Sequence, residues 1–160
     1  MKKSFMIISA LLLLLTGCGT TDLQEELVSY INDEMPKLGE KEEAVLSAYD
    51  SVTGANYTDD PTTYAVLKDE VIPQYTDFID DLESVKIDSD ELSALHEDYI
   101  AAANLQHSAF VLILEAIENQ DLAQITEANE MLAEARKAMR KYQQDVEKLC
   151  EENDVTLEKK

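Results

Sequence analysis

Apolar residues in the last long segment of the chain recur in alternating steps of three and four. This spacing keeps one narrow face of a helix pointed at its neighbours, and it is typical of helices that pack in bundles or coiled coils. The residues that carry the pattern are Ile125, Ala128, Leu132, Ala135, Met139, Tyr142, Val146 and Leu149. The segment therefore predicts a long helix, and it favours an all-α fold.

Three earlier segments also show helical periodicity, and Gly (4) and Pro (3) are scarce. We expect helices to start at a Thr21/Gln24 capping box, at Asp60 with Pro61, and at Asp88 with Glu91. Pro36, Gly39 and Pro73 should bend or interrupt the first two helices. Short connections make successive helices antiparallel, so we predict an up-down four-helix bundle over residues 22–152, with a charged, frayed tail at 153–160. An elongated coiled-coil hairpin that pairs with a second copy also fits. Aromatic residues on the second and third stripes favour the closed bundle.

The start of the chain has the three parts of a secretory leader. Met1-Lys2-Lys3 is basic, Phe5 to Leu15 is apolar, and small residues follow. The ending Leu15-Thr16-Gly17-Cys18 resembles the lipobox of bacterial lipoproteins. The resemblance implies removal of residues 1–17 and attachment of a diacylglyceryl group to Cys18, which would hold the protein in the bilayer at the extracytoplasmic face of the cell membrane. The leader and the Lys/Glu/Asp-rich composition look like those of Gram-positive lipoproteins. An ordinary signal peptide or a short signal anchor is the alternative.

Residues 18–21 would then be the lipidated cysteine and a short spacer. Only Gly19 and Thr20 separate Cys18 from the predicted cap at Thr21, and an extended spacer of that length reaches no more than about 10 Å. We therefore expect the domain to lie close to the bilayer, unless the first helical turns fray and act as a longer tether.

The chain is strongly acidic, with 34 acidic and 13 basic residues and a net charge of −21. This charge argues against nucleic acid as a partner and against electrostatic binding to anionic lipid. With Cys18 acylated, Cys150 has no partner for a disulfide, and we interpret it as a packing residue.

Residues that could carry chemistry are few. His96 and His107 lie on one face of the third helix but ~16 Å apart along its axis, too far to share a metal ion. The chain has no Glu-x-x-His pair, nucleophile elbow or glycine-rich phosphate loop. The acidic residues around 77–91 lack the spacing of a calcium loop. We expect no enzyme activity, no metal site and no cofactor.

Five basic residues on the fourth helix form an exception to the acidic composition: Arg136, Lys137, Arg140, Lys141 and Lys148. They could dock an acidic protein or an anionic envelope polymer. Alternatively they pair with acidic neighbours such as Glu40, Glu42, Glu43, Glu134 or Asp145, which would stabilise little.

The sequence thus predicts a non-enzymatic, membrane-anchored binding or accessory protein for a protein or envelope partner. The alternative is a lipoprotein that binds a small ligand or metal, in a pocket among Tyr64, Tyr75, Tyr99, His96 and His107. A third hypothesis is that a fragment of the leader, such as Ala10 to Gly17, serves as a peptide signal.

Overall fold

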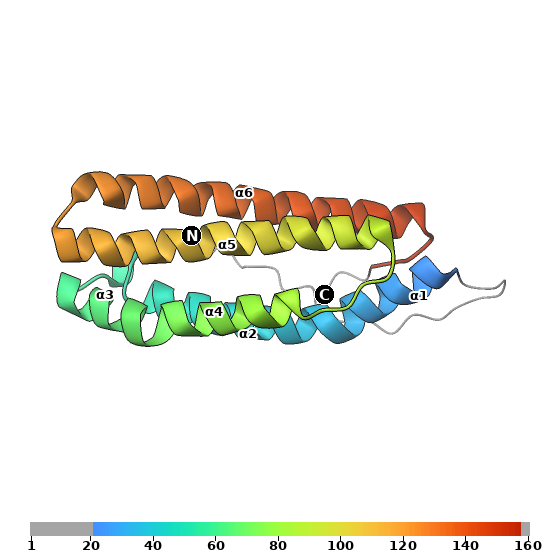
Figure 1. Ribbon diagram of the computed structural model, residues 1–160, viewed down its shortest axis with the longest axis horizontal. Coiled ribbons are helices and arrows are strands. Elements are labelled where there is room, and N and C mark those ends of the chain that lie inside the picture. The colour runs from blue at the N-terminus through green and yellow to red at the C-terminus, as the bar shows by residue number, and fades with distance from the viewer. Residues whose placement is uncertain (1–20, 158–160) are drawn as a thin grey trace.

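The computed structural model describes residues 21–157, and within this range the chain is helical with no strand (Figure 1). The all-α expectation is confirmed. Cys18 and the leader lie outside the described residues. In chain order the elements are α1 (Asp22–Ser29), η1 (Tyr30–Glu34), α2 (Met35–Ser51), η2 (Gly54–Asn56), α3 (Asp60–Val66), η3 (Leu67–Val71), α4 (Ile72–Glu83), α5 (Asp90–Asn119) and α6 (Leu122–Glu152).

Four long helical stretches lie side by side in two layers, with α5 and α6 in one layer and α2 and α4 in the other (Figure 1). Helix α5 packs along α6 and also contacts α4, and α4 packs on α2. The apolar stripes read from the sequence face inward: between Leu27 and Leu149, none of the stripe residues is exposed. Burial of these residues is the main favourable term in the folding free energy.

The prolines change the helical hydrogen bonding where irregularities were expected. A π-helical turn, η1 or η3, ends one residue before each proline-containing start, at Met35-Pro36 and Ile72-Pro73. In both turns the residue before the proline donates its N–H to the carbonyl five residues back, Met35 to Tyr30 and Ile72 to Leu67. A proline has no N–H, and its ring clashes with the carbonyl four residues back, so the wider turn relieves the clash while the helix continues.

Two of the three predicted helix starts need correction. The Thr21/Gln24 capping box is present as expected. Helix α3 is capped by Asp59, whose side chain accepts from the N–H of Thr62, and Asp60 is already helical. Helix α5 has Ser89 at its N-cap position without a side-chain cap. There the Glu26 carboxylate of α1 accepts from the N–H groups of Asp88 and Ser89. The carboxylate that satisfies this helix start therefore comes from another helix, which local sequence spacing cannot reveal.

The described part of the tail, residues 153–157, begins with a turn after α6. Asp154 takes a left-handed conformation with φ 55°, and the N–H of Val155 donates to the carbonyl of Cys150 at 2.8 Å. This Schellman-type turn brings Val155 into the core, where it is 7 % exposed. Burial of this apolar residue explains why the chain turns back toward the core after α6.

Helix α5 is the one described helix that is long and apolar enough to cross a bilayer by length and composition. Such a test is also passed by the central helix of a core. Here α5 packs against α6 and α4, and its buried face includes the polar residues His96 and Gln106.

Candidate functional site

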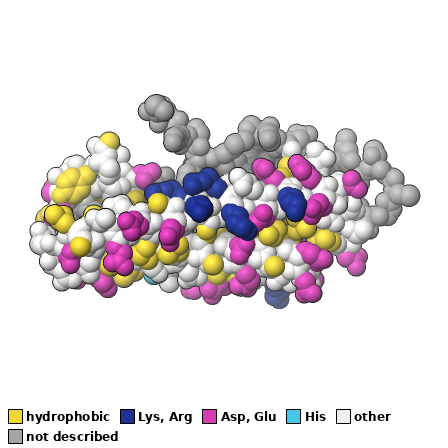
Figure 2. Space-filling model, turned by 90° about the horizontal axis from the view of Figure 1, so that it is seen from above, with side chains coloured by type: hydrophobic (Ala, Val, Ile, Leu, Met, Phe, Trp, Pro, Cys, Tyr) yellow, Lys and Arg dark blue, Asp and Glu magenta, His cyan; other side chains and the backbone are white. Residues whose placement is uncertain are grey.

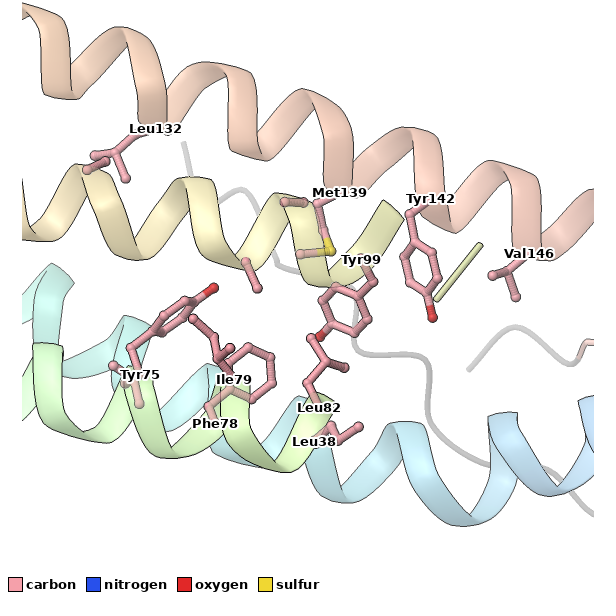
Figure 3. Packing of buried hydrophobic residues seen from close by; sticks show 14 of the residues in the cluster. Leu38, Tyr75, Phe78, Ile79, Leu82, Tyr99, Leu132, Met139, Tyr142 and Val146 are labelled. Atoms are coloured by element: carbon pink, nitrogen blue, oxygen red, sulfur yellow. The ribbon is translucent and has the colours of Figure 1, made fainter. Parts of the chain in front are cut away.

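A buried carboxylate lies at the centre of the fold. Glu42 of α2 is 8 % exposed and shares one face of the helix with the buried apolar residues Leu38 and Val45. It accepts hydrogen bonds from the Tyr75 hydroxyl at 3.1 Å and from the Tyr99 hydroxyl at 2.9 Å. The three side chains come from α2, α4 and α5, so this cluster joins both layers. Figure 3 shows Tyr75 and Tyr99 among the apolar side chains of the core.

Burial raises the pKa of Glu42 above its usual value of 4.5, and the hydrogen bonds from Tyr99 and Tyr75 oppose the shift only in part. The folded protein therefore holds the Glu42 proton more tightly than the unfolded chain does. It follows that the stabilisation contributed by the protonated group is fully present below about pH 4.5 and is lost as the pH rises through the raised pKa.

This linkage predicts that the stability of the protein and that of its Glu42→Gln variant depend differently on pH. Within the window above pH 4.5, the protein should lose stability relative to the variant by up to about 1.4 kcal/mol per pH unit. Urea unfolding of both proteins at intervals from pH 4 to pH 8 measures the difference, and the subtraction cancels the contribution of the many surface carboxylates. Parallel stability curves would show that Glu42 keeps its usual pKa.

A second polar chain, a row of hydrogen-bonded side chains, lies beside the one formed by Glu42, Tyr75 and Tyr99. The His96 Nε2 lies 2.8 Å from the carbonyl oxygen of Leu82, which can only accept, so Nε2 carries the proton. The His96 Nδ1 must then accept from the Tyr30 hydroxyl at 2.9 Å, and Tyr30 in turn accepts from the Tyr142 hydroxyl at 2.6 Å. The chain is directed from Tyr142 to Leu82 and leaves His96 neutral. Burial lowers the pKa of His96, in agreement with this arrangement.

The two polar chains touch through aromatic rings. Tyr99 and Tyr142 stack with ring centroids 4.7 Å apart, side by side in Figure 3. The phenols of these two chains are hydrogen-bonded within the protein, as buried polar groups usually are. This pattern is typical of a polar network that positions helices.

The residues suggested for a ligand pocket do not line one site: Tyr75 and Tyr99 both donate to Glu42, and the other three have different partners. His107 Nε2 lies 3.1 Å from the Thr76 hydroxyl, whereas His96 bonds Tyr30 and Leu82. The Tyr64 hydroxyl donates to Glu118 at the surface. The two histidines therefore do not act together. Among residues 21–157, no group of three or more His, Cys, Asp or Glu side chains is placed to hold a metal ion.

An open groove lies between α2 and α6, with α5 at its floor. It holds a pocket of about 350 Å³ lined by residues of all three helices: Glu43, Leu46, Ser47, Tyr49, Asp50, Gln106, Phe110, Leu132 and Arg136. We call it the α2–α6 pocket. Gln106 is 7 % exposed, and its Nε2 has no hydrogen-bond partner among the described residues. An unpaired buried amide is costly, so this pocket differs from the satisfied polar chains of the core.

Compared with known protein families, with characterised proteins and with solved structures, the chain matches none of them.

A larger pocket of about 520 Å³ lies between the α1–α2 stretch and the end of α4. Its charges are partly neutralised within it, because Lys41 pairs with Asp81 and Lys37 lies 3.6 Å from Glu34. The α2–α6 pocket has no such pairs among the described residues and is the stronger candidate for binding.

The basic residues of α6 divide into two groups. Lys141 lies 2.5 Å from Asp145 and 3.5 Å from Asp98, and Lys148 lies 3.4 Å from Glu152. Pairing with Asp145 was expected, but pairing with Asp98 was not. Arg136, Lys137 and Arg140 form no ion pair within the described part of the chain. Figure 2 shows basic side chains gathered in a row on one face, with acidic side chains around them.

Cys150 is fully buried, as its interpretation as a packing residue required. Burial raises the pKa of its thiol to about 11, which leaves little thiolate at neutral pH.

Sequence reasoning missed Tyr30, Glu26 and Gln106. Gln106 was detectable, because it lies four residues after Ala102 and four before Phe110 on the apolar stripe of α5. The role of Glu26 gave no local signal, because its partners lie more than sixty positions away.

Proposed function

We propose that residues 22–152 form an antiparallel up-down four-helix bundle, held at the outer face of a bacterial cell membrane by a lipidated Cys18. We propose further that this bundle binds a protein or envelope partner and catalyses no reaction.

The observation that most supports this proposal is that the two ends of the helical rod differ. Helix α1 starts at Asp22 behind a complete capping box, four residues after Cys18. The side chain of Gln24 donates to the carbonyl of Asn153 at 2.7 Å, so the start of α1 and the end of α6 are joined. A lipid on Cys18 would place this joined end at the membrane.

The opposite end of the rod carries exposed apolar side chains. Tyr57, before α3, is 52 % exposed, and Leu122, at the start of α6, is 81 % exposed. Asp60 accepts from the hydroxyl of Tyr57 and from the Nε2 of Gln120, which joins the two connections into one tip. Figure 1 shows the α5–α6 turn and α3 at the end of the rod opposite α1. The 31 residues of α6 extend about 46 Å. The tip is thus suited to meet a partner at that height above the bilayer.

The absence of catalysis is supported by how the buried titratable groups are used. Glu42 and His96, the buried carboxylate and the buried imidazole of the described residues, are held in internal hydrogen bonds that join helices. A general acid or base must instead reach a substrate proton.

Two measurements test this proposal. Fractionation of cells should find the protein in the membrane, and Cys18→Ser should release it from lipid attachment. A photo-crosslinking amino acid at Leu122 should then capture one partner in cells, whereas the same group at the exposed Thr156, near the joined end, should not. A Cys18→Ser protein that is processed and anchored as before would contradict the lipid anchor. Equal or absent capture at both positions would contradict recognition by the tip.

A further inference from the structure

We propose that the α2–α6 pocket binds a small zwitterionic molecule with an apolar body, of the class of amino acids and dipeptides. In the bound state Arg136 and the Gln106 amide would hold the carboxylate, and Glu43 and Asp50 would face the ammonium group. This site goes beyond the partner binding proposed above and does not depend on it.

The pocket has the size and the lining of a small-molecule site. Its volume of about 350 Å³ lies within the usual range of ~300–1,000 Å³. Leu46 and Tyr49, which are only partly buried, supply apolar surface, and the ring of Tyr49 packs on the fully buried Phe110 with a centroid distance of 4.8 Å. An apolar or aromatic side chain of a ligand would be buried against these residues.

The Gln106 amide supplies a donor that lacks a partner. Its residue is more than nine-tenths buried, and no described residue accepts from Nε2. A buried donor without a partner is costly, and Nε2 is shielded from solvent in the unliganded structure, so the Gln106 side chain must turn toward the pocket before an acceptor oxygen on a ligand can pair with it. A carboxylate is a stronger acceptor than a neutral oxygen, because charge-assisted hydrogen bonds are shorter and stronger.

The charges of the pocket specify a ligand with two opposite charges. Arg136 lies on the α6 wall, while Glu43 and Asp50 lie on the α2 wall. None of the three forms an ion pair within the described part of the chain, so both signs of charge remain available. Glu43 and Asp50 are seven residues apart, which places them on one face of α2. A simple anion would face two carboxylates and a simple cation would face Arg136, whereas a zwitterion complements both walls.

Binding of four probes to the full chain in detergent micelles tests the site. Isothermal titration calorimetry and thermal unfolding should show saturable binding and a raised Tm with L-phenylalanine or L-leucyl-L-phenylalanine. N-acetyl-L-phenylalanine, which lacks the positive charge, and L-phenylalaninamide, which lacks the negative charge, should bind at least tenfold more weakly. No saturable binding of either zwitterion at 10 mM, or equal binding of the capped probes, would overturn the proposal.

Variants then locate the binding. Arg136→Gln and Gln106→Met should each weaken binding of the zwitterion at least tenfold. Arg136 is exposed, so its variant keeps the fold even if the core is sensitive at Gln106. Lys137→Gln is the matched control, because Lys137 neighbours Arg136 but does not line the pocket. Unchanged affinity in both pocket variants, or equal loss in the control, would overturn the assignment. A negative outcome in either test of the pocket does not bear on partner binding by the tip, which the crosslinking experiment tests separately.

Discussion

The double variant Tyr75→Phe/Tyr99→Phe, which lacks the two hydroxyls that donate hydrogen bonds to Glu42, is expected to have a free energy of unfolding lower by about 3–5 kcal/mol at pH 8. Each hydrogen bond to a charged group contributes ~1.5–3 kcal/mol, and both donors are lost. No cavity of side-chain size is created, since only oxygen atoms are removed. Urea unfolding followed by circular dichroism measures the loss.

A third substitution tests whether the unpaired Glu42 carboxylate causes this loss of stability. Adding Glu42→Leu to the double variant removes the stranded carboxylate and should recover most of the stability, because apolar replacement of a whole buried polar group can be nearly neutral. Tyr57→Phe is the matched control: its hydroxyl also bonds a carboxylate, that of Asp60, but at the surface, and a change within about 0.5 kcal/mol is expected. Equal losses in the double and triple variants would mean that Glu42 is not the group left unsatisfied.

Tyr30→Phe is expected to cost about 2–4 kcal/mol. The Tyr30 hydroxyl both donates to His96 and accepts from Tyr142, so its removal leaves two buried groups without their partner. Tyr142→Phe removes the second bond and a weak contact of the Tyr142 hydroxyl with the Met35 sulfur at 3.3 Å, but it leaves Tyr30 donating to His96, so a loss of about 1 kcal/mol is expected.

The order of the two variants is the decisive result. Both substitutions remove one oxygen from a buried tyrosine, so their transfer and packing effects are alike, and unfolding in urea at pH 7.5 compares them directly. If Tyr142→Phe costs as much as Tyr30→Phe, then the direction assigned to this hydrogen-bond chain is wrong.

The helices themselves were largely predictable, because periodicity and caps are local. The stripe of α6 appears where the spacing placed it, and Glu42 was identifiable as a polar residue on the same helix face as the apolar Leu38 and Val45. The start of α3 was misplaced by one residue, because adjacent Asp59 and Asp60 are equivalent as candidate caps in the sequence. The candidate site was less predictable. Arg136 was noticed for its charge, but nothing local shows that it shares a pocket with Gln106 and Glu43.

The sequence by itself determined that the described chain is helical, which faces of the helices are buried, and where the prolines alter the backbone. These properties depend on residues within one or two turns of each other. Only the tertiary structure decided that Glu26 caps α5, that Tyr30, His96 and Tyr142 form one directed chain, and that the Gln106 amide is left unpaired beside a groove. Each of these depends on side chains brought together from distant helices, and a hydrogen bond requires positions accurate to a few tenths of an ångström, which residue spacing along one helix does not specify.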